Sequence, residues 1–238
     1  MIKKDFLIGI ASLNELENLV ILINKILLSI PDIPILIVDD SNLNYGTFES
    51  LFNFNSRVIS IYRSQRLGVG SAHQAMLKYA KENEFKNLVT MDADETHSVL
   101  DLKKMIDYQG NSGLVIGSRF MTGGGMQNWE LKRRIATRTA HYITWKFSGV
   151  SLDFTSGIRR YSFKHQSFDA VENLEYNDYR FFYLSTFWAL QEKVHISQIA
   201  VNLQRRNLGE SKMSTAHALK LIFSLFTDSF NFFIRNKW

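Results

Sequence analysis

The stretch Asn87-Leu88-Val89-Thr90-Met91-Asp92-Ala93-Asp94 carries an apolar run that leads directly into two aspartates. Side chains alternate between faces in an extended strand, so Asp92 and Asp94 point the same way where the strand leaves its sheet. In an open α/β sheet, ligands bind at this edge. Two interpretations follow. The pair holds a hard cation such as Mg²⁺, which takes one or two carboxylates together with substrate phosphates. Alternatively, one of the pair, or Thr96 or Ser98, caps the next helix.

Segments with strand and helix patterns alternate along the rest of the chain. Short apolar runs predict buried strands at residues 6–12, 35–40, 58–63, 88–91, 114–119 and 196–203, with a short strand near 159–161. Apolar residues at helical spacing predict helices at 14–30, 48–54, 68–80, 100–106, 129–147, 179–192 and 215–235. This alternation predicts one α/β domain at residues 1–214, with a mostly parallel central sheet and helices on both faces. An apolar helix within residues 215–238 follows that domain.

Two connecting segments carry more specific expectations. Asn14 precedes the first helix, and its side chain is expected to cap that helix. Residues 121–126 read Met-Thr-Gly-Gly-Gly-Met, and this glycine-rich, polar pattern predicts a mobile loop after the strand at 114–119.

The composition restricts the classes of partner. The 238 residues carry a net charge of +5, which favours anionic partners such as phosphates, nucleic acid or an anionic membrane surface. There is no cysteine, so disulfides and thiolate metal sites are excluded. No uninterrupted apolar run reaches the ~18 residues that would indicate a membrane span. Residues 1–5 lead directly into a strand and leave no room for a signal peptide. We therefore expect a cytoplasmic protein, peripheral at the cytoplasmic face of a membrane.

The glycines before the helix at 68–80 raise the question of phosphate binding. Gly68-x-Gly70 could cradle a pyrophosphate with backbone N–H groups, as in dinucleotide-binding proteins. Two observations argue against a dehydrogenase. The fingerprint requires Gly or Ala at the position of His73, and it belongs after the first strand rather than the third. The chain also contains no Walker sequence.

The helix at 129–147 is basic, with Lys132, Arg133, Arg134 and Arg138. These residues form either a solvated face or a phosphate site, because guanidinium groups match phosphate oxygens. The lysine and arginine residues of the chain occur in short groups, and no nucleic-acid-binding signature is present. We therefore expect no nucleic-acid partner.

Seven motifs occur in order over nearly the whole chain. They are Asn14-Glu15-x-Glu17-Asn18-Leu19, Ile37-Val38-Asp39-Asp40-Ser41, Arg66-Leu67-Gly68-Val69-Gly70-Ser71-Ala72, Met91-Asp92-Ala93-Asp94 with His97, Gly117-Ser118-Arg119 with Gly123-Gly124-Gly125 and Trp129-x-x-x-Arg133-x-x-x-Thr137-Arg138, Asp153-x-Thr155-Ser156-Gly157-x-Arg159, and Gly209-Glu210-Ser211-Lys212. In this order and spacing the chain resembles the family 2 glycosyltransferases, and within them the dolichol-phosphate (polyprenol-phosphate) mannosyltransferases.

The resemblance implies a GT-A fold and assigns roles to the motif residues. Asp92 and Asp94 would hold Mg²⁺ or Mn²⁺ on the donor diphosphate. The implied contacts to the nucleotide and its phosphates are Asn14, Glu15, Asp39, Asp40, Gly68, Gly70, Asp92, Thr137 and Ser211. The implied catalytic positions, which include the cations around the phosphates, are Asp94, Arg119, Arg133, Asp153 and Lys212.

The chemistry of a nucleotide-sugar donor bears on the acceptor. The leaving diphosphate gains charge, which a divalent cation and cationic side chains stabilise. A hydroxyl acceptor needs a general base. A phosphomonoester does not, because its second pKa of about 6 leaves it largely dianionic at neutral pH. The surplus of Arg and Lys in the second half favours a phosphate acceptor over a hydroxyl. The resemblance then implies transfer of a mannose-like hexose from a GDP- or UDP-sugar to a polyprenyl phosphate, and attack opposite the departing diphosphate would invert the anomeric centre.

Two alternatives stay open. Transfer to a saccharide hydroxyl, as in cell-surface polysaccharide assembly, requires a carboxylate base, for which Asp153 and Glu210 are the candidates. A nucleotide-sugar-binding protein without turnover is the other alternative. It is supported by two departures from the family pattern, Glu95-Thr96 after the aspartate pair and Phe182-Tyr183-Leu184 in place of Gln-x-Glu.

The last helix is unusually apolar, with the residues Leu219, Leu221, Ile222, Phe223, Leu225, Phe226, Phe230, Phe232, Phe233 and Ile234. Three interpretations are open: a core helix, a homodimer contact, or an in-plane membrane anchor flanked by Arg235, Lys237 and Trp238. A Phe stripe at helical spacing favours packing in the core or in a dimer.

Overall fold

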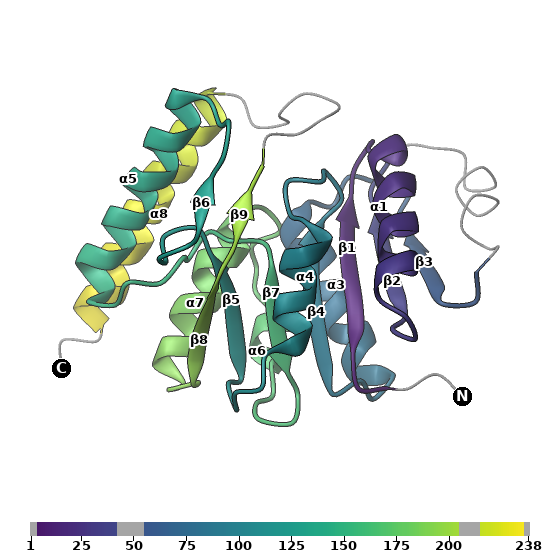
Figure 1. Cartoon of the computed structure of the whole chain (residues 1–238). Helices are drawn as coiled ribbons and strands as arrows, with labels where there is room; N and C mark the ends of the chain where they lie inside the picture. The colour runs from purple at the N-terminus through teal and green to yellow at the C-terminus, as the bar shows by residue number, and fades with distance from the viewer. Residues whose placement is uncertain (1–3, 42–54, 205–214, 236–238) are drawn as a thin grey trace.

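A seven-stranded sheet forms the centre of the molecule in the computed structural model, which describes residues 4–41, 55–204 and 215–235 (Figure 1). The strands run in the order β3-β2-β1-β4-β7-β5-β8. Their bounds are β1 Leu7–Ser12, β2 Ile35–Asp39, β3 Val58–Tyr62, β4 Asn87–Asp92, β5 Leu114–Ser118, β7 Arg159–Ser162 and β8 Ile196–Ala200. All neighbours are parallel except at β7, which runs antiparallel to both β4 and β5. The predicted α/β fold with a mostly parallel sheet is confirmed.

Helices cover both faces of this sheet. On one face lie α1 (Leu16–Ser29) and α4 (Val99–Asp107), and on the other lie α3 (Val69–Glu82), α6 (Asp169–Glu172) and α7 (Arg180–Gln191). The central strands are continuous apolar runs because they are buried on both sides, and every residue of β2 is buried. Strands β1, β4 and β5 run in the same direction, so their carboxyl ends meet at one edge of the sheet. Ligands bind at this edge in folds of this kind.

A buried arginine holds β7 and the segment before it against α7. Arg159 is fully buried. It donates hydrogen bonds of 2.8–2.9 Å to the carbonyl oxygens of Phe154, Ser156 and Phe182 and to the hydroxyl of Ser185. A buried cation is costly unless its donors are satisfied, so these contacts fix the path of the chain as it approaches the end of β4.

The second half adds a small two-stranded sheet. Strand β6 (Gly125–Met126) pairs in parallel with β9 (Asn202–Leu203). The glycine-rich segment at 121–126 is thus not wholly a loop, and that prediction is wrong at Gly125 and Met126, which find backbone partners in β9. The single strand predicted at 196–203 divides at Val201 into β8 and β9, because the two halves join different sheets.

A helix pair closes the other end of the chain, where α5 (Leu131–Ser148) and α8 (Thr215–Arg235) lie side by side (Figure 1). One side of α8 is in the core, where Leu225 and Phe232 pack with Phe187. The opposite side is exposed, so the prediction of a packed helix holds for one side only. No helix in the described part of the chain is long and apolar enough to cross a membrane.

The start of α1 differs from the prediction. The N-cap position is Glu15, without a side-chain hydrogen bond. Asn14 has a left-handed backbone with φ of 51°, whereas a capping residue needs an extended backbone. Its backbone N–H instead donates to the Ser41 hydroxyl at 2.6 Å, which joins the ends of β1 and β2. The helix predicted at 48–54 lies outside the described residues.

Candidate active site

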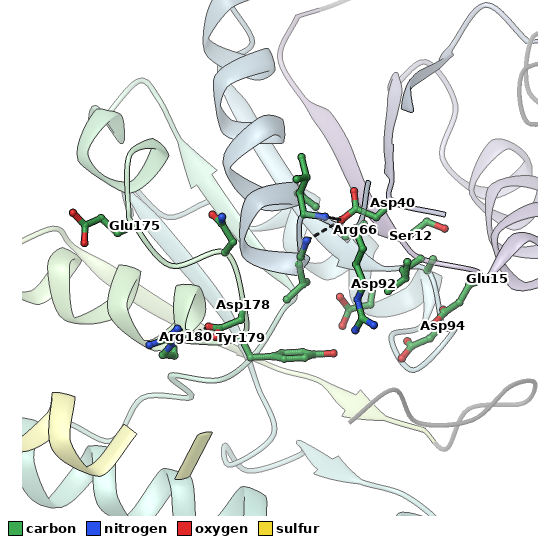
Figure 2. Close-up of a pocket in the computed structure, with 18 residues that line it drawn as sticks. Ser12, Glu15, Asp40, Arg66, Asp92, Asp94, Glu175, Asp178, Tyr179 and Arg180 are labelled. Atoms are coloured by element: carbon green, nitrogen blue, oxygen red, sulfur yellow. Dashed lines mark hydrogen bonds and ion pairs between the residues drawn. The ribbon is translucent and has the colours of Figure 1, made fainter. Parts of the chain in front are cut away.

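A cavity of about 680 Å³ opens at the carboxyl edge of β1 and β4 (Figure 2). Its charged lining consists of six carboxylates and two arginines: Glu15, Asp40, Asp92, Asp94, Glu175, Asp178, Arg66 and Arg180. We call it the acidic cavity. In Figure 2, Arg66, Asp92 and Asp94 gather on one side, and the ring of Tyr179 points toward them from the start of α7. The cavity therefore brings the predicted metal pair together with a segment that lies some 85 residues later in the chain.

The two aspartates differ in their surroundings. Asp94 is 3% exposed, and its Oδ1 accepts hydrogen bonds from the Thr96 backbone N–H at 3.0 Å and the Thr96 hydroxyl at 2.7 Å. The side chain of Asp92 is 35% exposed. A Cβ added to Gly157 would lie 3.2 Å from Oδ2 of Asp92, so glycine allows the segment before β7 to approach this carboxylate. Asp94 is thus fixed from within the protein, and Asp92 reaches into the cavity.

The capping alternative is confirmed at Ser98 and at neither aspartate of the pair. Ser98 caps α4, because its hydroxyl accepts the N–H of Asp101 at 3.0 Å. Between Asp94 and Ser98 the chain turns through Glu95, whose backbone is left-handed with φ of 56°. The Glu95 carboxylate forms an ion pair with Lys25 on α1.

His97 lies behind Asp92, with its Nε2 3.9 Å from Oδ2 of that residue. The ring is buried, and burial lowers the pKa of His97 to about 4 despite the nearby Asp94 carboxylate. The imidazole is therefore neutral at neutral pH and adds no positive charge beside Asp92.

The aspartate pair fits a hard divalent cation. Within residues 4–41, 55–204 and 215–235, no cluster of three or more His, Cys, Asp or Glu side chains could enclose a metal by itself. Two adjacent carboxylates at the mouth of an open cavity match Mg²⁺, which is held by one or two carboxylates and completed by phosphate oxygens and water. Mn²⁺ accepts the same oxygen ligands.

The two aspartates at the end of β2 have structural partners. Asp39 is buried and accepts two hydrogen bonds from Ser41, at 2.8 and 3.0 Å. Asp40 lines the acidic cavity, where it pairs with Arg63 at 2.5 Å and accepts the backbone N–H groups of Leu67 and Gly68. These contacts hold the turn that leads into α3.

The glycines at the start of α3 serve close packing of backbone. The N–H groups of Gly70 and Ser71 both donate to the carbonyl oxygen of Asn177. A Cβ on Gly68 would lie 2.4 Å from that oxygen, and one on Gly70 would lie 2.8 Å from the carbonyl oxygens of Tyr176 and Asp178. The segment that precedes α7 therefore binds the backbone N–H groups at the start of α3. The glycines allow this segment to approach α3 and to line the acidic cavity.

A second cavity, of about 320 Å³, lies beyond the end of β5. Its lining includes three arginines, one from the end of β5 and two from α5: Arg119, Arg134 and Arg138. We call it the basic cavity. Of the described acidic residues, none is among those that line it. Because β4 and β5 are parallel, both cavities belong to the same edge of the sheet.

Arg119 is held by Asp153. The Arg119 Nε and Nη2 atoms donate to the two carboxylate oxygens at 2.8 and 2.5 Å, and the Arg119 backbone N–H donates at 3.0 Å. Arg119 also donates to the Thr155 hydroxyl at 2.6 Å. Burial raises the pKa of the Asp153 carboxyl, but the charge and hydrogen bonds of Arg119 outweigh it, and the pKa lies below its usual value. Asp153 is therefore an ionised anchor for Arg119.

The predicted phosphate-binding residues divide between two faces of α5. Arg134 and Arg138 line the basic cavity. The guanidinium of Arg133 instead lies 3.8 Å from the centre of the Trp129 ring. Neither Arg133 nor Thr137 is among the described residues that line the cavity. Ser211, Lys212 and Glu210 lie outside the described residues.

The structure adds residues that sequence reasoning did not single out. Tyr179 and Arg180 line the acidic cavity, as does Arg66, which stands in one of the seven motifs but was given no role of its own. No pattern in the sequence marks Tyr179 and Arg180, because segment 175–180 reaches this site through backbone contacts to α3. Arg134 and Arg138 did carry a signal, since a spacing of four places them on one face of a helix.

The comparisons with known proteins agree with this architecture. The profile of Glycosyl transferase family 2 matches residues 7–175, and the chain belongs to this family of glycosyltransferases. Its fold is the GT-A fold. It is similar in structure to glucosyl-3-phosphoglycerate synthase of Mycobacterium tuberculosis, crystallised with Mn²⁺, UDP and glucosyl-3-phosphoglycerate. The TM-score is 0.65 at 14% identity, over 95% of this chain and 80% of that one.

Two relatives are more similar in sequence. The chain is 28% identical over 225 residues to the polyprenol monophosphomannose synthase of Mycolicibacterium smegmatis, which covers 92% of this chain and 84% of that protein. It is 29% identical over 212 residues to the undecaprenyl-phosphate mannosyltransferase of Micrococcus luteus, which covers 86% of each chain.

Proposed function

We propose that this glycosyltransferase moves a mannose-like hexose from a GDP- or UDP-sugar to a polyprenyl phosphate and inverts the anomeric centre. The observation that carries the proposal is the pair of cavities of opposite charge at one edge of the sheet. The acidic cavity suits a donor that arrives with a cation, and the basic cavity suits an acceptor that is itself an anion. The names of the two mannosyltransferase relatives support the same substrate classes.

In the acidic cavity, Asp92 and Asp94 would hold Mg²⁺ or Mn²⁺. When bound, the cation supplies positive charge to the leaving diphosphate as a Lewis acid. Thr96 keeps the Asp94 carboxylate in one orientation through two hydrogen bonds. Arg66 and Tyr179 line the remaining wall, where they can contact the nucleotide or the sugar.

In the basic cavity, Arg119, Arg134 and Arg138 would bind the acceptor phosphate. Guanidinium groups bind phosphate oxygens bidentately and remain protonated at all relevant pH values. A phosphate dianion attacks the anomeric carbon without loss of a proton, so this side needs no general base. We assign Asp153 the role of orienting Arg119, because both of its oxygens bind that side chain.

The saccharide-acceptor alternative is less well supported by the same contacts. A hydroxyl acceptor requires a carboxylate that can take its proton. Asp153 is buried, paired with Arg119 and lowered in pKa, and it therefore makes a poor base. The other candidate, Glu210, lies outside the described residues.

A transfer assay tests the proposal. Purified protein would be given radiolabelled GDP-mannose or UDP-glucose, Mg²⁺ or Mn²⁺, and either a short-chain polyprenyl phosphate or the corresponding unphosphorylated alcohol. We expect metal-dependent labelling of the phosphate acceptor and none of the alcohol. Labelling of the alcohol or of a saccharide instead would favour the hydroxyl mechanism. Nucleotide-sugar binding without transfer to any acceptor would contradict the enzymatic proposal.

A further inference from the structure

The loop that follows Asp94 is bonded to a segment from much later in the chain. The carbonyl oxygen of Thr96 accepts the backbone N–H of Gln204 at 3.0 Å. Thr96 is also the residue whose own N–H and hydroxyl bind the Asp94 carboxylate. Gln204 therefore holds the residue that orients one member of the metal pair, Asp92 and Asp94.

Gln204 is held in turn by Trp129. The indole Nε1 of Trp129 donates to the carbonyl oxygen of Gln204 at 3.0 Å. Trp129 is only 8% exposed and belongs to the same apolar core as Leu203. The face of its ring carries the guanidinium of Arg133. A buried indole N–H needs a hydrogen-bond partner, and Gln204 supplies it.

The strand before Gln204 joins this connection to the basic cavity. Strand β9 pairs with β6, and the N–H of Gln127 donates to the carbonyl oxygen of Leu203 at 2.8 Å. Strand β6 lines the basic cavity. Segment 202–204 therefore runs from the wall of the basic cavity to the loop that carries Asp94.

Another contact on the same loop is weaker. Glu95 forms an ion pair with Lys25 of α1. The Lys25 side chain is 54% exposed, and ion pairs with an exposed partner contribute little to stability. The connection through Gln204 consists of backbone groups and a buried indole, so it restricts the position of Thr96 more closely.

We propose that Trp129 is a positioning residue for the metal pair. By holding Gln204 it fixes the backbone of Thr96, and Thr96 keeps the Asp94 carboxylate in one orientation. Removal of a group that supports a metal ligand commonly lowers metal affinity by about tenfold or more. The effect on a cation rests on the proposed function, whereas the hold on the loop does not.

The variant Trp129→Phe deletes the indole donor and keeps an aromatic ring in the core. We expect the dissociation constant of Mn²⁺, measured with excess nucleoside diphosphate by electron paramagnetic resonance of free Mn²⁺, to rise by about 3–10-fold. Trp129→benzothienylalanine, which replaces only the N–H by sulfur, should show the same loss without a change of shape. The control is Trp145→Phe on α5, where the ring is 45% exposed, and it should bind Mn²⁺ as the unmodified protein does.

A double variant separates this route from a general loosening of the core. Trp129→Phe and Thr96→Val both act on Asp94 through Thr96. The combined loss of Mn²⁺ affinity should therefore be smaller than the product of the two separate losses. A combined loss equal to that product would overturn the proposal, and so would unchanged Mn²⁺ affinity in both Trp129 variants.

Hydrogen–deuterium exchange in the absence of metal tests the hold on the loop by itself. The backbone amides of residues 94–97 should exchange about 3–10-fold faster in Trp129→Phe than in Trp145→Phe, because a hydrogen bond that supports the loop is lost. Equal exchange in the two variants would overturn the proposal. An unmodified protein that binds no Mn²⁺ would contradict the metal assignment of the proposed function, while faster exchange in Trp129→Phe would still support the role of Trp129 in positioning the loop.

Discussion

The acidic and basic cavities lie at the same edge of one sheet and are built in different ways. Most of the acidic cavity comes from the ends of β1 and β4, from the turn before α3 and from segment 175–180, which backbone hydrogen bonds join to α3. The basic cavity depends on side chains, with one arginine anchored by Asp153 and two projecting from α5. The first site can therefore be set by the fold of the parallel sheet, while the second is set by the choice of residues on one helix.

This difference suggests how the two sites divide the reaction. A diphosphate donor that brings a divalent cation needs carboxylates, and an acceptor without its own cation needs guanidinium groups. If the division is real, each cavity should lose its own ligand when its charges are removed and keep the ligand of the other.

The largest effect is expected at Asp94 in the acidic cavity. Asp94→Asn keeps the shape of the side chain and an oxygen for the Thr96 donors, but it removes the charge. We expect transfer to fall by about a hundredfold or more, because charge at the leaving group is no longer stabilised. Mn²⁺-dependent binding of a nucleoside diphosphate, measured by calorimetry, should fall with it. Asp107→Asn, at an exposed position at the end of α4, is the control. Full Mn²⁺ binding by Asp94→Asn would refute the metal assignment.

The next effect is expected in the basic cavity. Arg134→Ala/Arg138→Ala should raise KM for a water-soluble polyprenyl phosphate by about 10–100-fold, which corresponds to the loss of one or two charge-assisted hydrogen bonds. The dissociation constant of the nucleoside diphosphate should stay the same. Lys78→Ala on α3 provides an exposed-charge control. If both ligands were lost equally, the two cavities would not be separate sites.

The sequence predicted the acidic half better than the basic half for a physical reason. Apolar runs that end in Asp39-Asp40 and Asp92-Ala93-Asp94 reveal both the strands and the edge at which their carboxylates gather. The lining contributed by Tyr179 could not be predicted, since it depends on contacts between Gly70 and Asn177 across the fold. On α5 the basic residues could be predicted but the rotation of the helix could not, and that rotation turns Arg134 toward the cavity and leaves Arg133 over Trp129.

The roles of Glu95 and Thr96, which depart from the family pattern, could also be assigned only from the structure. From the sequence, Glu95-Thr96 could be recognised only as a departure from the family pattern. In the structure, Glu95 pairs with Lys25, and Thr96 binds the carboxylate of Asp94. The departure at Glu95 and Thr96 therefore changes the contacts that support Asp94 and leaves both aspartates in place.

A smaller effect is expected when that support is removed. Thr96→Val keeps the volume and the backbone N–H bond to Asp94 but deletes the hydroxyl donor. Mn²⁺ affinity in the presence of nucleoside diphosphate, followed by electron paramagnetic resonance of free Mn²⁺, should fall by about tenfold. Thr96→Ser restores the hydroxyl and should restore the affinity. A loss in the Ser variant with none in the Val variant would point to packing of the Thr96 methyl group rather than to the hydrogen bond.

The smallest effect is expected on stability, from a buried residue in the core that supports both cavities. His73 on α3 is fully buried against Phe181 and Phe182, and neither ring nitrogen has a hydrogen-bond partner among the described residues. Burial, with a smaller contribution from the charge of Arg159, lowers the pKa of His73 to about 3. The unfolded chain has a His pKa near 6.5, so below that pH the unfolded state binds a proton that the folded state does not hold.

The free energy of unfolding should therefore fall as the pH drops from about 6.5 toward 3, by at most about 1.4 kcal/mol per pH unit for this one group. His73→Leu removes the group and fills the same apolar site, so its stability should depend less steeply on pH over that window. Urea unfolding of both proteins at pH 7.5, 6 and 5 measures the two slopes. Parallel curves would show that His73 is protonated or solvated in the folded protein. A reduced slope with unchanged nucleotide and acceptor binding at pH 7.5 would place His73 in the shared core and in neither cavity.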